Sequence, residues 1–72
     1  MILKLKEFNE LTEKEQEDLY AIDLEGLDYS LDNGYIDPEN YIVDEESKKK
    51  YREAEKIVYE LKNHLEELFE HL

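Results

Sequence analysis

The sequence contains no cysteine, no tryptophan, one proline and two glycines. Without cysteine the chain has no disulfide framework and no thiolate metal site. A chain of 72 residues is expected to form one small domain, residues 1–72. The core of such a domain is small, so the packing of helices or self-association must supply its stability.

Long apolar runs are also missing. The N-terminal residues Met-Ile-Leu-Lys-Leu-Lys contain too short an apolar run for a signal peptide, and no other stretch is long enough to span a bilayer. We therefore expect a cytoplasmic protein with no membrane partner.

Catalytic signatures are absent as well. The sequence has no glycine-rich phosphate loop, no cysteine nucleophile and no serine–histidine arrangement. Carboxylates are plentiful, but a general acid needs an apolar pocket that raises its pKa, and so short a chain has little room for one. We expect a protein that is not an enzyme and binds no cofactor.

Cations are nearly missing from one long stretch. Between Glu13 and Glu46 there are thirteen acidic residues and one cation, Lys14, so this stretch carries the whole formal net charge of −12. Nucleic acids and anionic membranes bind cationic surfaces, which excludes both as direct partners. The charge favours a basic protein surface as the partner, or serves only to keep the protein in solution.

The C-terminal third carries the clearest helical pattern. Its apolar residues recur at alternating spacings of three and four, which predicts a heptad seam on one helix over residues 45–71, about 40 Å long. Asp44 or Ser47 is suited to cap its start. Ile57 and Phe69 widen the apolar stripe. The seam consists of Tyr51, Ala54, Val58, Leu61, Leu65, Leu68 and Leu72.

A second helix is predicted over residues 13–32. Thr12 and Glu15 fit a capping box, in which hydroxyl and carboxylate each accept a hydrogen bond from a free backbone amide. An apolar stripe then runs at spacings of four, three and four through Tyr20, Leu24, Leu27 and Leu31. The stripe crosses Gly26, which costs about 1 kcal/mol inside a helix, so the helix either runs to residue 32 or ends at Gly26.

The predicted fold is all-α: a two-helix hairpin with a short N-terminal segment and a closing loop at 35–43. Within that loop, Asp37-Pro38 predicts a cap followed by a short helical turn. The alternative is an α+β fold with a small N-terminal strand and a hairpin near residues 28–37, because Asp32-Asn33-Gly34-Tyr35 suits a type I′ turn. The helical period of the apolar residues favours the all-α fold.

Two fragments resemble metal sites without satisfying their chemistry. Residues 33–39 are similar to the second half of an EF-hand loop, but Tyr29, Leu31 and Asn40 stand where calcium needs oxygen ligands and a bidentate glutamate. His64 and His71 lie seven residues apart, about 10 Å along a helix, which is too far to share one ion. We expect no metal site, and a polar flank beside the heptad seam.

An acidic face is the candidate functional site. On a helix over 13–32, the side opposite the apolar stripe carries a carboxylate row with two apolar anchors, Ile22 and Tyr29. Apolar anchors ringed by polar groups are typical of binding surfaces. The alternative is that Ile22 and Tyr29 are buried. The predicted partner-binding residues are Glu15, Asp18, Ile22, Glu25, Asp28, Tyr29, Asp32, Asp37 and Glu39.

In size and charge, and in its early stretch Leu-Lys-Glu-Phe-Asn-Glu-Leu-Thr-Glu-Lys-Glu-Gln, the chain resembles small acidic inhibitor proteins of phages and mobile elements. Some of these mimic nucleic acid and block restriction enzymes, CRISPR effectors, nucleases or polymerases. The resemblance implies a non-enzymatic inhibitor in the host bacterial cell that binds a basic, nucleic-acid-binding protein. It assigns no functional residues.

The alternative function uses the heptad seam. A homodimer joined through this seam would be a helical interaction module, such as an antitoxin-like partner or an assembly adaptor, and the acidic residues would only keep it in solution.

Overall fold

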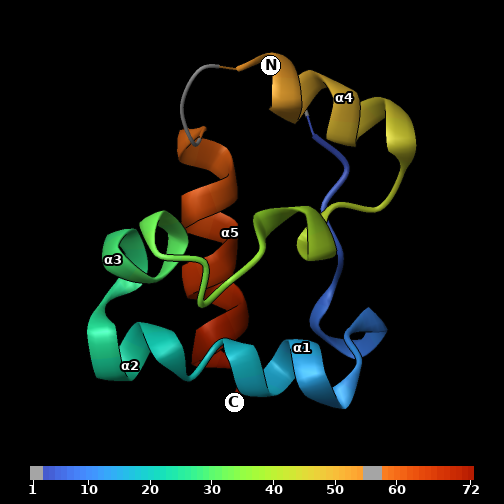
Figure 1. The fold of residues 1–72 in the computed structure, drawn as a ribbon. Helices are drawn as coiled ribbons and strands as arrows, with labels where there is room; N and C mark the ends of the chain where they lie inside the picture. The colour runs from blue at the N-terminus through green and yellow to red at the C-terminus, as the bar shows by residue number, and fades with distance from the viewer. Residues whose placement is uncertain (1–2, 55–57) are drawn as a thin grey trace.

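The computed structural model describes residues 3–54 and 58–72, and every regular element in these ranges is helical, which confirms the all-α class (Figure 1). Two are short 3₁₀ helices, η1 and η2, and the others are α-helices. In chain order they are η1 (Phe8–Glu10), α1 (Glu13–Asp18), α2 (Ala21–Glu25), α3 (Leu27–Asp32), η2 (Pro38–Tyr41), α4 (Glu45–Glu53) and α5 (Tyr59–Glu70).

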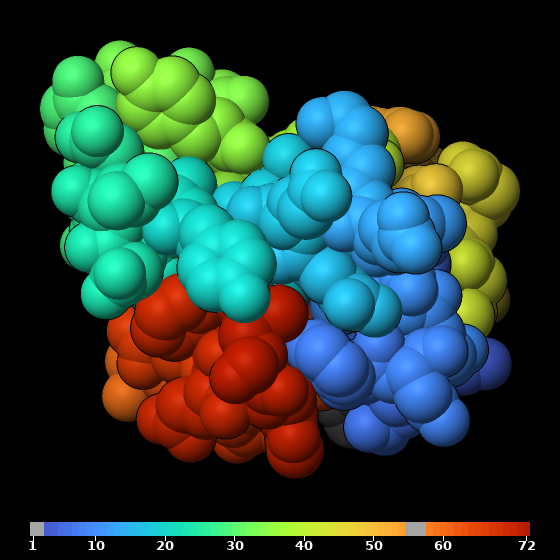
Figure 2. Space-filling view, turned by 90° about the horizontal axis from the view of Figure 1, so that it is seen from below, coloured from blue at the N-terminus to red at the C-terminus, as the bar shows by residue number. Residues whose placement is uncertain are grey.

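Helix α5 stands at the centre of the fold, with α2 and α3 on one side and the N-terminal segment on the other (Figure 1). Its seam residues Leu61, Leu65 and Leu68 are buried, as the spacing predicts. Seen from below, α1 and α2 lie beside the C-terminal end of α5 (Figure 2). The remaining buried apolar residues come from the segments around α5: Leu3, Leu11, Leu19, Leu31, Ile36, Tyr41 and Ile42.

The predicted single helix over 45–71 is wrong. Helix α4 ends at Glu53, and Ala54 is extended (φ −73°, ψ 134°). Val58, directly before α5, is extended too (φ −75°, ψ 145°). Ile57 lies outside the described residues. An unbroken helix here would be about 40 Å long, whereas the largest dimension of the molecule is 29 Å. The break allows several segments to surround the leucines of α5.

The predicted continuous helix over 13–32 is also wrong, because it is divided into α1, α2 and α3, but a helix does end before Gly26, as the alternative held. Gly26 separates α2 from α3 with φ +86° and ψ 154°, a conformation essentially restricted to glycine. Between α1 and α2 the backbone forms a 3₁₀-type turn, in which the amides of Leu19 and Tyr20 donate to the carbonyls three residues earlier. The two-helix hairpin is therefore replaced by a cluster of short helices around α5.

The N-terminal segment pairs with the η2 region without forming a strand. Leu5 and Ile42 make an isolated antiparallel bridge, and the Val43 amide donates to the Lys4 carbonyl at 2.8 Å. Residues 27–32 are helical, so the alternative hairpin near 28–37 is wrong, and no strand occurs in the ranges 3–54 and 58–72. Gly34, with φ +78°, serves the turn that follows α3.

The predicted caps are confirmed. Thr12 Oγ1 accepts from the Glu15 amide, and Glu15 Oε1 accepts from the Thr12 amide, so the capping box is complete. Asp44 Oδ1 accepts from the Ser47 amide at 2.8 Å and starts α4. Asp37 caps η2, with Pro38 at its first position. Local hydrogen-bonding signals thus located the starts of these helices more reliably than periodicity located their ends.

Candidate functional site

The acidic stretch covers the elements from α1 through η2 and the start of α4. From Glu15 to Ser47 the chain has twelve carboxylates and no lysine, arginine or histidine. Any cation that contacts these carboxylates must therefore come from another part of the chain. The structure separates them into carboxylates that cations of the same chain contact and carboxylates that are open to solvent.

Glu15 and Asp18 belong to the first group. The Glu15 side chain is only 13% exposed, and its Oε2 lies 3.2 Å from Lys6 Nζ. Burial raises its pKa, but hydrogen bonds from Thr12 and Lys6 outweigh that effect and hold the pKa of Glu15 below its usual value. Asp18 lies 3.2 Å from Lys14 Nζ. Both carboxylates therefore form ion pairs that stabilise α1. They are less available to a partner than the sequence predicts.

Ile22 is not an anchor on the acidic face. It is partly buried and packs against the core, next to Ala21. Leu24 and Tyr20, which the predicted stripe places in the core, are instead 78% and 52% exposed. The reason is the division of the helix, since each short helix takes its own orientation toward α5. The alternative of a buried residue is thus correct for Ile22, whereas Tyr29 is 51% exposed.

Glu25, Asp28, Tyr29 and Asp32 are exposed, as the sequence predicts. Lys62 of α5 contacts Asp28, with Nζ 2.8 Å from Oδ1, and this hydrogen bond raises the pKa of Lys62. The Asp28 side chain nevertheless remains open to solvent. These four residues lie on α2 and α3, on either side of Gly26.

Asp37 and Glu39 lie apart from these four, at η2. Asp37 is exposed but uses Oδ1 to accept from the Glu39 amide at 3.0 Å. Glu39 forms an ion pair with Arg52 of α4. The row predicted from Glu15 to Glu39 is therefore not one continuous surface.

The two short helices α2 and α3 pack against each other and form a corner around Gly26. Buried Ser30 fixes it, because its Oγ donates to the Ala21 carbonyl at 3.0 Å. The Tyr35 amide donates to the Ser30 carbonyl, and the Tyr35 ring stacks on Tyr29 with centroids 6.1 Å apart. We name this surface the acidic corner; it consists of the exposed residues Asp23, Leu24, Glu25, Asp28, Tyr29, Asp32 and Tyr35.

Sequence reasoning missed Asp23, Leu24 and Tyr35. The signal that could have found them is Gly26, because a helix that ends there no longer fixes which faces of α2 and α3 point outward. With that break, Leu24 need not follow the buried stripe. Tyr35 follows a turn, where periodicity gives no information.

The acidic corner adjoins a groove between α3 and α5. The groove has a volume of about 490 Å³ and is lined by Leu27, Asp28, Tyr59, Lys62, Asn63 and Glu66. Tyr59 is one of the most exposed aromatic residues among those described. The groove thus joins the corner, through Asp28, to the exposed Tyr59 at the start of α5.

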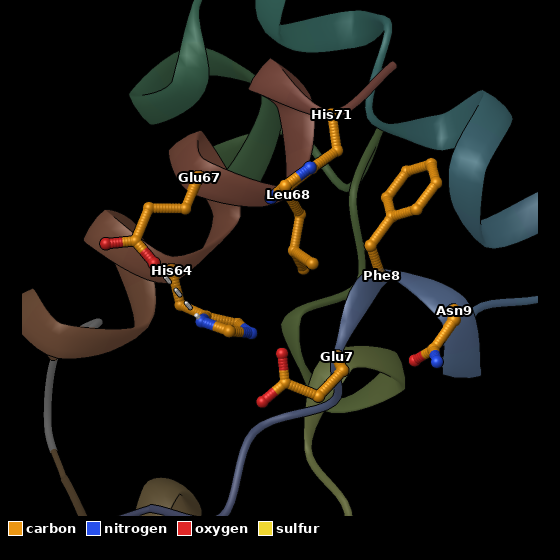
Figure 3. A pocket seen from close by; sticks show the side chains of 7 residues that line it. All are labelled: Glu7, Phe8, Asn9, His64, Glu67, Leu68 and His71. Atoms are coloured by element: carbon orange, nitrogen blue, oxygen red, sulfur yellow. Dashed lines mark ion pairs between the residues drawn. The ribbon is translucent and has the colours of Figure 1, made fainter.

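A second pocket, of about 370 Å³, lies between η1 and the C-terminal half of α5 (Figure 3). His64 and His71, which the sequence places on a polar flank, both line it together with Glu67. In the ranges 3–54 and 58–72 no group of three or more histidine and carboxylate side chains is arranged to hold a metal ion. None of the described helices is long and apolar enough to cross a membrane.

Comparison with known proteins finds no family model, no curated protein and no solved structure that matches this chain.

Proposed function

We propose that the protein is a non-enzymatic binding protein that uses the acidic corner to engage a basic, nucleic-acid-binding protein and compete with its nucleic acid. Suitable partners are a nuclease, a CRISPR effector, a restriction enzyme or a polymerase, in the cytoplasm of a bacterial host. The observation that carries the proposal is the juxtaposition, on α2 and α3, of solvent-exposed carboxylates with exposed apolar and aromatic side chains.

Electrostatics supports this choice of partner. The corner carries four exposed carboxylates within ten residues, Asp23, Glu25, Asp28 and Asp32. Among the described residues, one cation contacts them, Lys62 at Asp28. Such a surface attracts a partner groove lined by lysine and arginine and speeds the encounter. The same charge repels nucleic acid, so the proposed partner is a protein.

The apolar residues of the corner can supply binding energy through buried surface area, which charge alone does not provide. Leu24 is 78% exposed, and the stacked rings of Tyr29 and Tyr35 add an exposed aromatic surface. Tyrosines are enriched among the residues that dominate binding energy, because they bury a large area with little loss of conformational entropy. The carboxylates then form the polar rim around them.

The exposed carboxylates do not form a straight row that could imitate the phosphates of a duplex. Because Gly26 turns the chain, the carboxylates lie on two short helices that meet at an angle instead of on one helix of about 30 Å. The proposal therefore rests on local charge and on aromatic anchors, and does not require the phosphate spacing of a duplex.

The dimeric module is less well supported. Its interface would use Leu61 and Leu65, and both are fully buried within a single chain. A dimer through this seam would have to open the core of each monomer.

The test is to capture partners of the tagged full-length protein from a nuclease-treated bacterial lysate at low and at high salt. We expect specific proteins that bind nucleic acid, that are released as salt screens the charges, and that DNA or RNA displaces in competition. Partners retained equally at high salt, or not displaced by any nucleic acid, would contradict the proposal.

A further inference from the structure

The pocket between η1 and α5 is separate from the acidic corner and has its own chemistry. Its volume of about 370 Å³ falls in the ordinary range for pockets that hold a small group, about 300–1,000 Å³. No lysine or arginine lines it, and its lining residues are Glu7, Phe8, Asn9, His64, Glu67, Leu68 and His71. Most of the polar groups in this set accept hydrogen bonds.

His64 is held in one tautomer at the floor of this pocket. Its Nε2 lies 2.5 Å from the Lys6 carbonyl oxygen, which can only accept, so Nε2 carries the hydrogen and donates it. In the neutral ring, Nδ1 is then an acceptor. It faces Glu67 Oε2, also an acceptor, at 3.9 Å. In the neutral ring these two acceptors have no hydrogen between them and are placed to share a donor from outside, whereas a protonated ring would form the ion pair drawn in Figure 3.

Glu7 and the aromatic side chains complete the pocket. The Glu7 carboxylate points into the space in front of His64, on the side away from Glu67 (Figure 3). The Phe8 and His71 rings lie with centroids 5.6 Å apart and form the opposite wall. A ligand that enters here meets acceptors at one end and ring faces at the other.

We propose that this pocket binds an arginine side chain of a partner protein. The guanidinium group is planar, carries five N–H donors and is weakly hydrated, so it can bridge Nδ1 of His64 and the Glu67 carboxylate while it lies against an aromatic ring. A lysine ammonium is compact and strongly hydrated and has no planar face to lie against the ring, so it should bind here more weakly than a guanidinium group. The pocket opens to solvent, so the arginine enters from outside with its backbone on the surface.

The inference does not depend on the acidic corner, because no residue lines both. It predicts that the pocket binds an isolated arginine derivative in the absence of any partner protein.

The experiment is an NMR titration of the isotope-labelled full-length protein with Nα-acetyl-arginine N-methylamide near neutral pH. We expect saturable shifts centred on the amides of Phe8, His64 and Glu67. The citrulline analogue, which has the same shape but no charge, should give no saturable shift, and the lysine analogue should bind more weakly. Free arginine should bind no more tightly than the capped form, because the backbone stays outside the pocket.

Glu67→Gln is the test variant, and Glu66→Gln is its matched control. Both remove one exposed carboxylate from adjacent positions of α5, but Glu66 lines the groove toward α3. Loss of a charge-assisted hydrogen bond should weaken arginine binding about tenfold in Glu67→Gln. Glu66→Gln should change it by less than about twofold. Unchanged amide dispersion in both variants confirms that the fold is retained.

Three results would overturn the inference: arginine shifts that never saturate, equal binding of the citrulline analogue, or equal weakening by the two variants. Much tighter binding of free arginine would instead identify a site for the amino acid and would exclude a partner side chain. Neutralising the carboxylates of the acidic corner should leave the arginine titration unchanged, so the two proposals can fail separately.

Discussion

Two stretches of this chain share the same apolar spacing and differ in what becomes of it. Leu61, Leu65, Leu68 and Leu72 repeat at four, three and four residues, and so do Tyr20, Leu24, Leu27 and Leu31. The first three leucines of the C-terminal set are buried, whereas the first two residues of the other set are more than half exposed. Spacing places residues on one face only while the helix is continuous, and Gly26 interrupts it between Leu24 and Leu27.

The difference also separates the two roles of apolar side chains. On α5 they form the core around which the other segments pack, and on α2 and α3 some of them are left at the surface among carboxylates. The same residue types thus stabilise the fold in one region and provide candidate contacts for a partner in the other.

The largest effect should come from truncating the core stripe. Leu65→Ala removes a fully buried side chain and should lower the free energy of unfolding by about 2–5 kcal/mol. Leu24→Ala, the same substitution at the exposed stripe, should change it by less than about 0.5 kcal/mol. Urea denaturation followed by circular dichroism measures both. Similar losses in the two variants would show that Leu24 is buried and that the comparison is false.

Gly26→Ala tests the break between α2 and α3, because the sign of the change in the free energy of unfolding depends on whether the break exists. If residues 13–32 formed one helix, alanine would stabilise the protein by about 1 kcal/mol. With φ at +86° and ψ at 154°, alanine is strained, and we expect a loss of about 1–3 kcal/mol. Apart from Gly26 and its two chain neighbours, no residue has an atom within 4 Å of the added Cβ, so the loss should come from the backbone conformation. An increase in the denaturation midpoint would contradict the structure at this point.

The smallest effect concerns the covered carboxylate of α1. The pKa of Glu15 is held below its usual value of about 4.5, so its ionised form stabilises the fold at neutral pH, and this stabilisation disappears as pH falls through the folded-state pKa. Glu15→Gln keeps the capping box but loses the ion pair with Lys6. We expect it to be less stable than the natural chain by under about 1 kcal/mol at pH 7.

That difference should vanish at a pH well below 4.5, and urea titrations at the two pH values measure it. An equal difference at both values would mean that the carboxylate charge contributes nothing. Glu25→Gln, which removes an exposed carboxylate of the corner, is the matched control for the loss of one negative charge.

The sequence predicted the helical class, the caps at Thr12, Asp37 and Asp44, and the inward face of α5, because local hydrogen bonds and a long periodic run determine them. It left open a helix end at Gly26 but did not predict the breaks between α1 and α2 and after Glu53, since these depend on how short helices pack around α5 in a molecule of this size. The exposure of Leu24 and the inward turn of Ile22 follow from those breaks. The exposure of Glu25, Tyr29 and Asp32 was inferred from one continuous helix over 13–32, and these side chains are exposed although that helix is divided.

The pocket around His64 could not be predicted from the sequence for a different reason. His64, Glu67 and His71 lie on one helix, and their spacing indicates only a polar flank. Glu7 and Phe8 reach the same place from the other end of the chain, through the pairing of the N-terminal segment with Ile42 and the contact of His64 with the Lys6 carbonyl. Such long-range contacts have no local signature.

The most direct test of the central claim compares two variants of equal charge against a partner identified by salt-sensitive capture. In the corner variant, Asp23→Asn, Glu25→Gln, Asp28→Asn and Asp32→Asn remove four exposed carboxylates. In the control variant, four exposed carboxylates of α4 and α5 are neutralised instead: Glu45→Gln, Glu46→Gln, Glu53→Gln and Glu70→Gln.

Titration calorimetry of each variant with that partner then measures the affinity. If the acidic corner is the binding surface, the corner variant should lose at least about a hundredfold in affinity, whereas the control should lose less than about tenfold through the change in net charge. Equal losses would mean that only the total charge matters, and the acidic corner would then have no special role.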